Sequence, residues 1–205
     1  NNKDLYLLGE DKVNTIIDGS QNGSVVTMNG NSVIDGFTIQ NGSGTLLGST
    51  TYGAGIYCSG PANINIVNCN IQNNIIPPSI YSRAAGILST DNTNIFDCII
   101  RNNSAADYVG GIYNGSVSNC KFYNNFPSGY QPTQASTIGF NNLFDGNFIG
   151  MYVPVSVVIN NSIFINNNSS AILFMNSLNS EVNNSIFYNN GSPFVFGNNG
   201  PQSYS

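Results

Sequence analysis

The cysteines are the residues in this sequence that are chemically the most reactive. Cys120 stands beside Lys121 in SNCKFYNN, Ser118 to Asn125, and thiol catalysis needs a base to form the thiolate. The chain has no histidine, and strand alternation would place Lys121 on the face opposite Cys120. The cysteines also lack a CxxC pair, which argues against a zinc site. We therefore expect no metal site and no cofactor.

Acidic residues are the next candidates for catalysis. A polysaccharide lyase would need carboxylates for calcium and a basic residue as base, and a glycoside hydrolase needs carboxylates about 5 to 10 Å apart. The ten acids are scattered, and only Asp107 with Arg83 and Arg101 can be assembled on one flank. We assign no catalytic residue, and a carbohydrate-active enzyme, a lyase or an epimerase, stays the alternative function.

Tyrosines offer binding rather than catalysis. A tyrosine presents a flat apolar face and a hydroxyl, which suit contact with a sugar ring or another protein. Four lie in segments that we read as loops, with one arginine and one aspartate, and others lie at outward strand positions. The candidate binding residues are Tyr52, Tyr57, Tyr81, Arg83, Asp107, Tyr108, Tyr113, Tyr123 and Tyr130.

A repeat must position these side chains. Apolar residues recur at intervals of 20 to 32 residues, and a period near 22 fits one coil of a parallel β-helix better than a propeller blade of about 40 residues. The sequence therefore predicts an all-β, right-handed parallel β-helix of about eight coils. The anchor column is Ile17, Ile39, Ile71, Ile100, Phe122, Phe144, Phe164 and Phe187.

Other columns keep the same register. Five residues before the anchor stand Ile34, Ile66, Ile95, Val117, Ile159 and Val182, with Lys12 and Gly139 as exceptions. Two residues before it, Cys69, Cys98 and Cys120 should point inward as core thiols. Their spacing of about 4.8 Å is within disulfide range, so one pair could oxidise, but the parallel in-register geometry favours free thiols. Two residues after the anchor, Asn41, Asn73, Asn102, Asn124, Asn166 and Asn189 should turn the chain with left-handed backbone and stack as an asparagine ladder.

Insertions follow the asparagine turn in successive coils, so their loops should gather on one flank of the rod. They are the segments 42–52, 75–83, 104–109 and 126–136. A set of loops on a rigid scaffold is a common place for a binding site.

Composition limits the partners. The chain has 205 residues, only 7% of them charged, and a net charge of -5 with five basic residues, which excludes a phosphate-backbone footprint for nucleic acid. We expect a single domain over residues 1–205, with no membrane span. The polar, weakly charged surface is typical of an extracellular or cell-surface protein.

The segments LYLLGEDKVNTIIDG (Leu5 to Gly19) and SVIDGFTIQNG (Ser32 to Gly42), with GGIY alternating with NCKFYNN, resemble the parallel β-helix proteins of the pectate-lyase-like superfamily, especially adhesin-like members. The resemblance implies the fold and leaves lyases, hydrolases, epimerases, adhesins and structural shafts open. Such proteins normally have an earlier coil and a cap, so we expect a fragment of a longer chain. Uncapped ends predict a homo-oligomer or filament, alongside a polysaccharide or cell-surface protein as partner.

Overall fold

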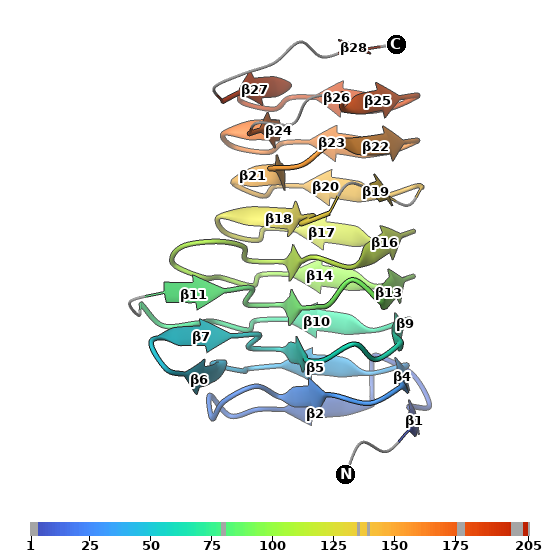
Figure 1. Ribbon diagram of the computed structural model, residues 1–205, viewed down its shortest axis with the longest axis vertical. Coiled ribbons are helices and arrows are strands. Elements are labelled where there is room, and N and C mark those ends of the chain that lie inside the picture. The colour runs from blue at the N-terminus through green and yellow to red at the C-terminus, as the bar shows by residue number, and fades with distance from the viewer. Residues whose placement is uncertain are drawn as a thin grey trace.

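The computed structural model describes residues 4–78, 81–134, 136–138, 140–175, 179–197 and 203–204, with only the backbone for 136–138 and 203–204. Short strands wind in successive coils into a rod, with the first strand at one end and the last at the other (Figure 1). The part of the chain that is described holds no helix long and apolar enough to cross a membrane.

The second sheet of each coil carries the anchor column. All its pairs are parallel, and the column from Ile17 to Phe187 is paired residue by residue in the predicted register. The prediction of eight coils is therefore confirmed. The strands are β2 (Ile16–Asp18), β5 (Thr38–Gln40), β10 (Asn70–Gln72), β14 (Ile99–Arg101), β17 (Lys121–Tyr123), β20 (Leu143–Asp145), β23 (Ile163–Ile165) and β26 (Ile186–Tyr188).

The first sheet precedes the anchor in each coil. Its strands are β1 (Leu5–Leu8), β4 (Ser32–Asp35), β9 (Ile64–Val67), β13 (Thr93–Phe96) and β16 (Ser116–Ser118), followed by a second group, β19 (Ser136–Ile138), β22 (Val157–Asn160), β25 (Glu181–Asn183) and β28 (Ser203–Tyr204). The column of Ile34, Ile66, Ile95 and Val117 is paired as predicted. Placing Lys12 in it was wrong, because Leu7 pairs with Ile34 and residues 9–15 form an added loop. Gly139 lies outside the described residues.

The third sheet completes the coil. Its strands are β3 (Val26–Met28), β8 (Ile56–Cys58), β12 (Ile87–Leu88), β15 (Ile112–Tyr113), β18 (Ser128–Gln131), β21 (Ile149–Val153), β24 (Ser170–Phe174) and β27 (Phe194–Phe196). Glycines start these strands where coils touch: a side chain on Gly111 would collide with the carbonyl oxygen of Gly129.

A small sheet projects from one flank, between the second and third sheets. It contains β6 (Thr45–Leu47), β7 (Thr50–Tyr52) and β11 (Tyr81–Arg83), which lie at the left of Figure 1. β6 and β7 form an antiparallel hairpin, and β11 adds to β7 in parallel. The predicted clustering of insertions on one flank is therefore confirmed for segments 42–52 and 75–83, which contain these strands.

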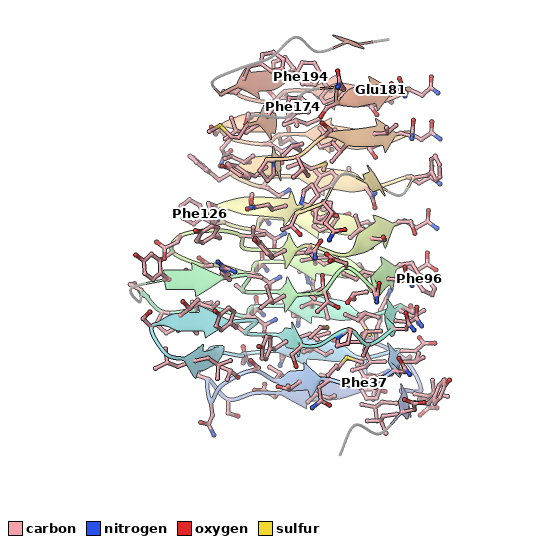
Figure 2. The ribbon with its side chains drawn as sticks, viewed as in Figure 1. Phe37, Phe96, Phe126, Phe174, Glu181 and Phe194 are labelled. Atoms are coloured by element: carbon pink, nitrogen blue, oxygen red, sulfur yellow. The ribbon has the colours of Figure 1, made fainter. Side chains whose placement is uncertain are left out.

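The interior is a stack of like side chains. The anchor residues from Ile39 to Phe164 are fully buried, and Phe122, Phe144, Phe164 and Phe187 stack with ring centroids 4.5, 4.7 and 5.0 Å apart. Figure 2 shows Phe174 and Phe194 within the upper coils, and these rings continue the aromatic packing beside Phe187. Parallel stacking of this kind buries apolar surface coil against coil, as a solenoid requires.

The asparagine ladder exists, but the predicted residues were wrong by one position. Asn41, Asn73, Asn102, Asn124, Asn166 and Asn189 all have left-handed backbone, with φ between 51° and 59°, as predicted. The side chain that enters the rod belongs to the next residue. The buried ladder is Asn74, Asn103, Asn125, Asn147 and Asn167, and half-buried Asn190 extends it.

Each ladder side chain is held from two sides. Asn103 Nδ2 donates to Asn125 Oδ1 (3.1 Å) in the next coil and to the Ile71 carbonyl (2.9 Å) in the previous one. The Asn103 backbone N–H also donates to Asn125 Oδ1, at 3.2 Å. The left-handed residue turns the chain from the second sheet toward the third, so its own side chain points outward and the following one points inward. In the predicted column, the described side-chain bond between asparagines of neighbouring coils joins Asn189 to Asn166, at the surface.

Candidate functional site

Six side chains form two columns on the flank, which we call the aromatic strip. The outer column is Tyr52, Arg83 and Tyr108, and the inner column is Tyr57, Leu88 and Tyr113. Strand pairing sets Arg83 opposite Tyr52, and Leu88 opposite both Tyr57 and Tyr113. In each coil the two members are five residues apart, so the same turn carries both columns up the rod.

The two columns support each other through ring contacts. Tyr52 stacks on Tyr57 with centroids 5.8 Å apart, and Tyr108 meets Tyr113 edge to face at 6.4 Å. The Arg83 guanidinium lies 5.6 Å from the Tyr108 ring and 5.8 Å from the Tyr113 ring. A cation over two ring faces fixes both rings, and most of its stabilisation comes from the quadrupole of each ring.

Asp107 fastens the loop that carries Tyr108. Its Oδ2 accepts from the Ser82 backbone N–H at 3.0 Å, and its own backbone N–H donates to Ser82 Oγ at 3.1 Å. Ser82 is completely buried on β11, so the pair ties the 104–109 insertion to the flank sheet. Asp107 therefore has a structural role that the sequence did not reveal.

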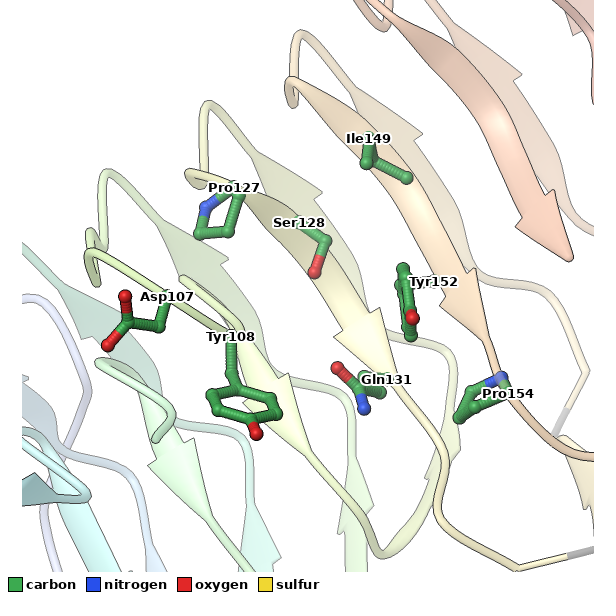
Figure 3. A pocket seen from close by; sticks show the side chains of 8 residues that line it. All are labelled: Asp107, Tyr108, Pro127, Ser128, Gln131, Ile149, Tyr152 and Pro154. Atoms are coloured by element: carbon green, nitrogen blue, oxygen red, sulfur yellow. The ribbon is translucent and has the colours of Figure 1, made fainter. Parts of the chain in front are cut away.

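A groove of about 320 Å³ lies beside the strip, on three neighbouring coils. Asp107 and Tyr108 form one wall, Gln131 of β18 forms the middle, and Tyr152 of β21 with Pro154 forms the far wall. Figure 3 shows Gln131 between the two tyrosines. Two aromatic walls around an amide give a ligand both apolar faces and hydrogen bonds.

A second groove of about 270 Å³ opens on the other side of Tyr108. It is lined by Ser49, Thr50, Tyr81, Arg83 and Tyr108. Tyr108 therefore belongs to both grooves and is 40% exposed, which makes it the central ring of the flank.

Gln131 and Tyr152 were missed from the sequence. Both extend the outward column of the third sheet, since Gln131 pairs with Tyr113 and Tyr152 follows one coil later. Counting coils from Tyr57 and Tyr113 would have found them. The signal was weak because these coils lack the Gly-Ile-Tyr pattern of the earlier ones.

The assignment of Tyr130 to the binding flank was wrong. Segment 126–136 was read as a loop because of its prolines and glycine, but Ser128–Gln131 forms β18, where Tyr130 pairs with Ile112 and Met151. Tyr130 is 1% exposed and donates its hydroxyl to the Gly115 carbonyl at 2.6 Å. Burial raises the pKa of this phenol.

Two further candidates lie away from the flank. Tyr123 is on β17 of the second sheet, where it faces outward and is half-buried, and burial there raises the pKa of its phenol. Arg101 is on β14 of the same sheet, and its Nε donates to Gln72 Oε1 at 2.8 Å. The expected grouping of Asp107 with Arg83 and Arg101 is therefore wrong, because the third member faces another side of the rod.

The thiols lie in the core, as their column predicts. Cys69, Cys98 and Cys120 are buried and unpaired, and so is Cys58 on the third sheet. Burial raises the pKa of Cys58 to about 12, and burial is also the largest cause of the raised pKa of Cys98. For Cys69 the hydrogen bond with Cys98 comes first and burial second. Cys58, Cys69 and Cys98 are protonated at neutral pH, and all four thiols are closed to solvent.

The described residues contain no group of three or more His, Cys, Asp or Glu side chains placed to hold a metal ion. The nearest carboxylate to the grooves, Asp107, already accepts hydrogen bonds from Ser82. The flank has the chemistry of a binding surface: rings, amides and hydroxyls, with one carboxylate and one guanidinium.

Comparison with known proteins identifies the family. The family model described as a right-handed β-helix region matches residues 54–204, well over half of the chain. Comparison with curated proteins finds no match, and neither does comparison with solved structures. The parallel register of the three sheets agrees with the family match. The chain therefore belongs to the right-handed β-helix family.

Proposed function

We propose that this protein is a non-catalytic, adhesin-like binding module that acts outside the cell and contacts carbohydrate through the aromatic strip and its two grooves. The observation that carries the proposal is the pairing of Tyr52 with Tyr57 and of Tyr108 with Tyr113, in register along one flank. Aromatic pairs that recur two coils apart, with Arg83 and Leu88 in the coil between them, suit a polymer that runs along the rod.

The grooves supply the polar half of sugar recognition. A sugar ring presents C–H groups on its faces and hydroxyls at its edge, so it binds best where an aromatic wall meets hydrogen-bonding groups. Tyr108 and Tyr152 offer the walls, and Gln131 offers an amide between them. Such a site suits a neutral glycan, with Asp107 in one groove and Arg83 in the other as its charged groups.

The strip is also preorganised. Tyr57 and Tyr113 stand on strands of the third sheet. Arg83 lies over the Tyr108 ring, and Asp107 fastens the loop that carries Tyr108. Binding therefore requires little ordering of side chains, and less of the contact energy is offset by lost conformational entropy.

Tyr108→Ala tests the proposal. Glycan-array screening of the wild type, followed by calorimetry with the strongest ligand, should give saturable binding that Tyr108→Ala weakens about tenfold or more, since both grooves lose their shared wall. Tyr108→Phe should keep most of the affinity that comes from stacking.

Tyr188→Ala is the matched control, because Tyr188 is 71% exposed on β26 of the second sheet. It should bind like the wild type, with both variants melting within a few degrees of it. Binding to no glycan, or equal loss in both variants, would refute the proposal.

The alternative function is a carbohydrate-active enzyme, and the position of Asp107 in the groove wall is what favours it. Incubation with acidic and neutral polysaccharides would reveal shortened or unsaturated products. Turnover that Asp107→Asn abolishes would replace the binding module with an enzyme. A protein partner and end-to-end filament formation stay predictions.

A further inference from the structure

A third groove lies on the second sheet, away from the aromatic strip. It holds about 280 Å³ and crosses four coils, from Ile16 of β2 through Thr38 and Asn70 to Ile99 of β14. Lys12 overhangs one side, and Gln72 with Arg101 forms the other. This groove plays no part in the proposed carbohydrate contact.

The loop that carries Lys12 is a built structure. The bond from Asn14 Nδ2 to Asp11 Oδ2 (2.9 Å) is the largest cause of the lowered pKa of Asp11. Asp11 Oδ1 also accepts from the backbone N–H groups of Asn14 (2.9 Å) and Val13 (2.7 Å), and both bonds act in the same direction. The Thr38 hydroxyl donates to the Lys12 carbonyl at 2.5 Å, which ties the loop to β5. Lys12 Nζ then reaches the Asp97 carbonyl oxygen at 3.4 Å, in the coil that contains Arg101.

Arg101 is held in place by a row of amides. Its Nε donates to Gln72 Oε1, Gln72 Nε2 donates to Gln40 Oε1 at 2.8 Å, and Gln40 Nε2 donates to Asp18 Oδ2 at 2.9 Å. Every donor in the row points toward Asp18, and the bond from Gln40 is the largest cause of the lowered pKa of that carboxyl. Two hydrogen bonds to Gln72 Oε1 hold the guanidinium, which lines the groove.

Positive charge is concentrated at this groove, although the chain as a whole carries a negative net charge. Lys12 and Arg101 are two of only five basic residues in a protein of net charge -5, and no acidic side chain is among the groove's lining residues. Asp97 contributes its backbone carbonyl to the Lys12 contact. Among the described residues, Lys12 Nζ has that single long hydrogen bond, and Arg101 Nε and Nη2 share one acceptor, Gln72 Oε1.

We propose that this groove binds a tetrahedral oxyanion, the phosphate or sulfate group of a small ligand, between Lys12 and Arg101. A guanidinium fork and an ammonium are the side chains that bind such groups most strongly, and each has donors left to give. The exposed side chains of Val13 and Ile16 offer an apolar surface for the body of the ligand.

NMR titration at constant ionic strength tests the site, with inorganic phosphate and inorganic sulfate as probes and chloride as background. Saturable shifts are expected for Arg101 Nε–H and for the backbone amides of residues 11–15, with a dissociation constant on the order of millimolar. Arg101→Gln should weaken binding about tenfold. If Arg101→Gln fails to fold, Lys12→Gln gives the same test.

Lys121→Gln is the matched control. Lys121 stands next to Ile99 in the neighbouring coil, is exposed, and does not line the groove, so its loss changes the net charge equally. Its affinity should stay within about twofold of the wild type. Unsaturable shifts, or equal weakening in both variants, would overturn the proposal.

The source of the oxyanion follows from two more titrations, with a sugar phosphate and a sugar sulfate. Tighter binding of one of them identifies the ester that the site prefers, and binding no tighter than that of the inorganic ion assigns the site to the free anion. The result is independent of the aromatic strip, because Tyr108→Ala should leave all these affinities unchanged.

Discussion

Neighbouring asparagines in one turn have different roles in this protein. Asn124 has φ of 51° and an exposed side chain, and it turns the chain from the second sheet toward the third. Asn125 is 1% exposed and takes part in hydrogen bonds to both neighbouring coils through its backbone and amide. The backbone of the first residue determines that the side chain of the second is buried.

Glycine substitutions separate these roles. Asn124→Gly should change the free energy of unfolding by less than about 1 kcal/mol, because glycine favours left-handed backbone. Asn125→Gly should cost about 3 to 5 kcal/mol, because it removes the side-chain hydrogen bonds of Asn125 with buried groups of Asn103, Asn147 and Ile100. Urea unfolding of both variants measures the difference, and equal losses would contradict the ladder assignment.

The sequence predicted which turn positions repeat as asparagine, but not which of two adjacent side chains points into the rod. Spacing identifies positions that repeat, whereas which of two adjacent asparagines points inward depends on the turn geometry. Alternation was sufficient inside strands: Cys120 and Phe122 are buried, while Lys121 is exposed and Tyr123 is half-buried, as predicted. The error arose where the chain leaves the strand, because alternation ends there.

At the scale of elements, strands of only two to five residues are enough to form a buried core, because every coil repeats them. Each strand lies on the next in parallel register, so a short element still buries its inward side chain completely. The cysteine column illustrates this, since Cys69 N–H donates to Cys98 Sγ at 3.4 Å in the following coil. The thiols are packing groups of the turn between the first and second sheets.

Burial of Cys58, Cys98 and Tyr130 predicts a loss of stability at alkaline pH. The pKa of Cys58 is about 12 in the folded protein, against an ordinary value of 9.0, so above pH 9 the unfolded chain releases a proton that the folded chain retains. The free energy of unfolding should therefore fall as pH rises from 9 toward 12, by about 1.4 kcal/mol per pH unit for each such group. The raised pKa values of Cys98 and Tyr130 act in the same direction.

Urea unfolding at pH 7.5, 9, 10 and 11 checks this dependence, with Cys58→Ala as the control. The variant should be less stable at pH 7.5 and should lose less stability between pH 9 and 11 than the wild type. Unchanged stability up to pH 11 would show that the thiol is not buried.

Element boundaries account for the errors in the candidate site. The anchor column placed the second sheet correctly, and the insertions at 42–52 and 75–83 do form the flank. Segment 126–136 looks like those insertions by composition, yet β18 continues the third sheet through it and buries Tyr130. Proline and glycine content indicates a break in a strand and does not distinguish a loop from a short strand between turns.

At the scale of the molecule, the rod separates two surfaces of different chemistry. The flank carries rings and amides, whereas the second sheet carries the groove between Lys12 and Arg101. In Figure 1 the small sheet of β6, β7 and β11 on the flank lies to the left of the strands of the second sheet. Figure 2 shows Phe126 on the flank side and Phe96 on the opposite side of the rod. A rigid scaffold of this kind holds both sites apart, so each should bind without affecting the other.

The combined length of the inner column of the aromatic strip and the groove beside it gives the central claim a quantitative form. From Tyr57 to Tyr152 the outward column of the third sheet covers four coil steps, about 19 Å at about 4.8 Å for each strand spacing. A glycan that lies along this column should gain contacts until it reaches that length.

The most direct test is calorimetric titration of the wild type with oligosaccharides of increasing length from the glycan that it binds. The affinity should increase with each added sugar until the chain spans about 19 Å and then become constant, and Tyr108→Ala should reduce it at every length that reaches Tyr108. An affinity that does not depend on length, or that Tyr108→Ala leaves unchanged, would contradict the assignment of the flank as a carbohydrate-binding surface.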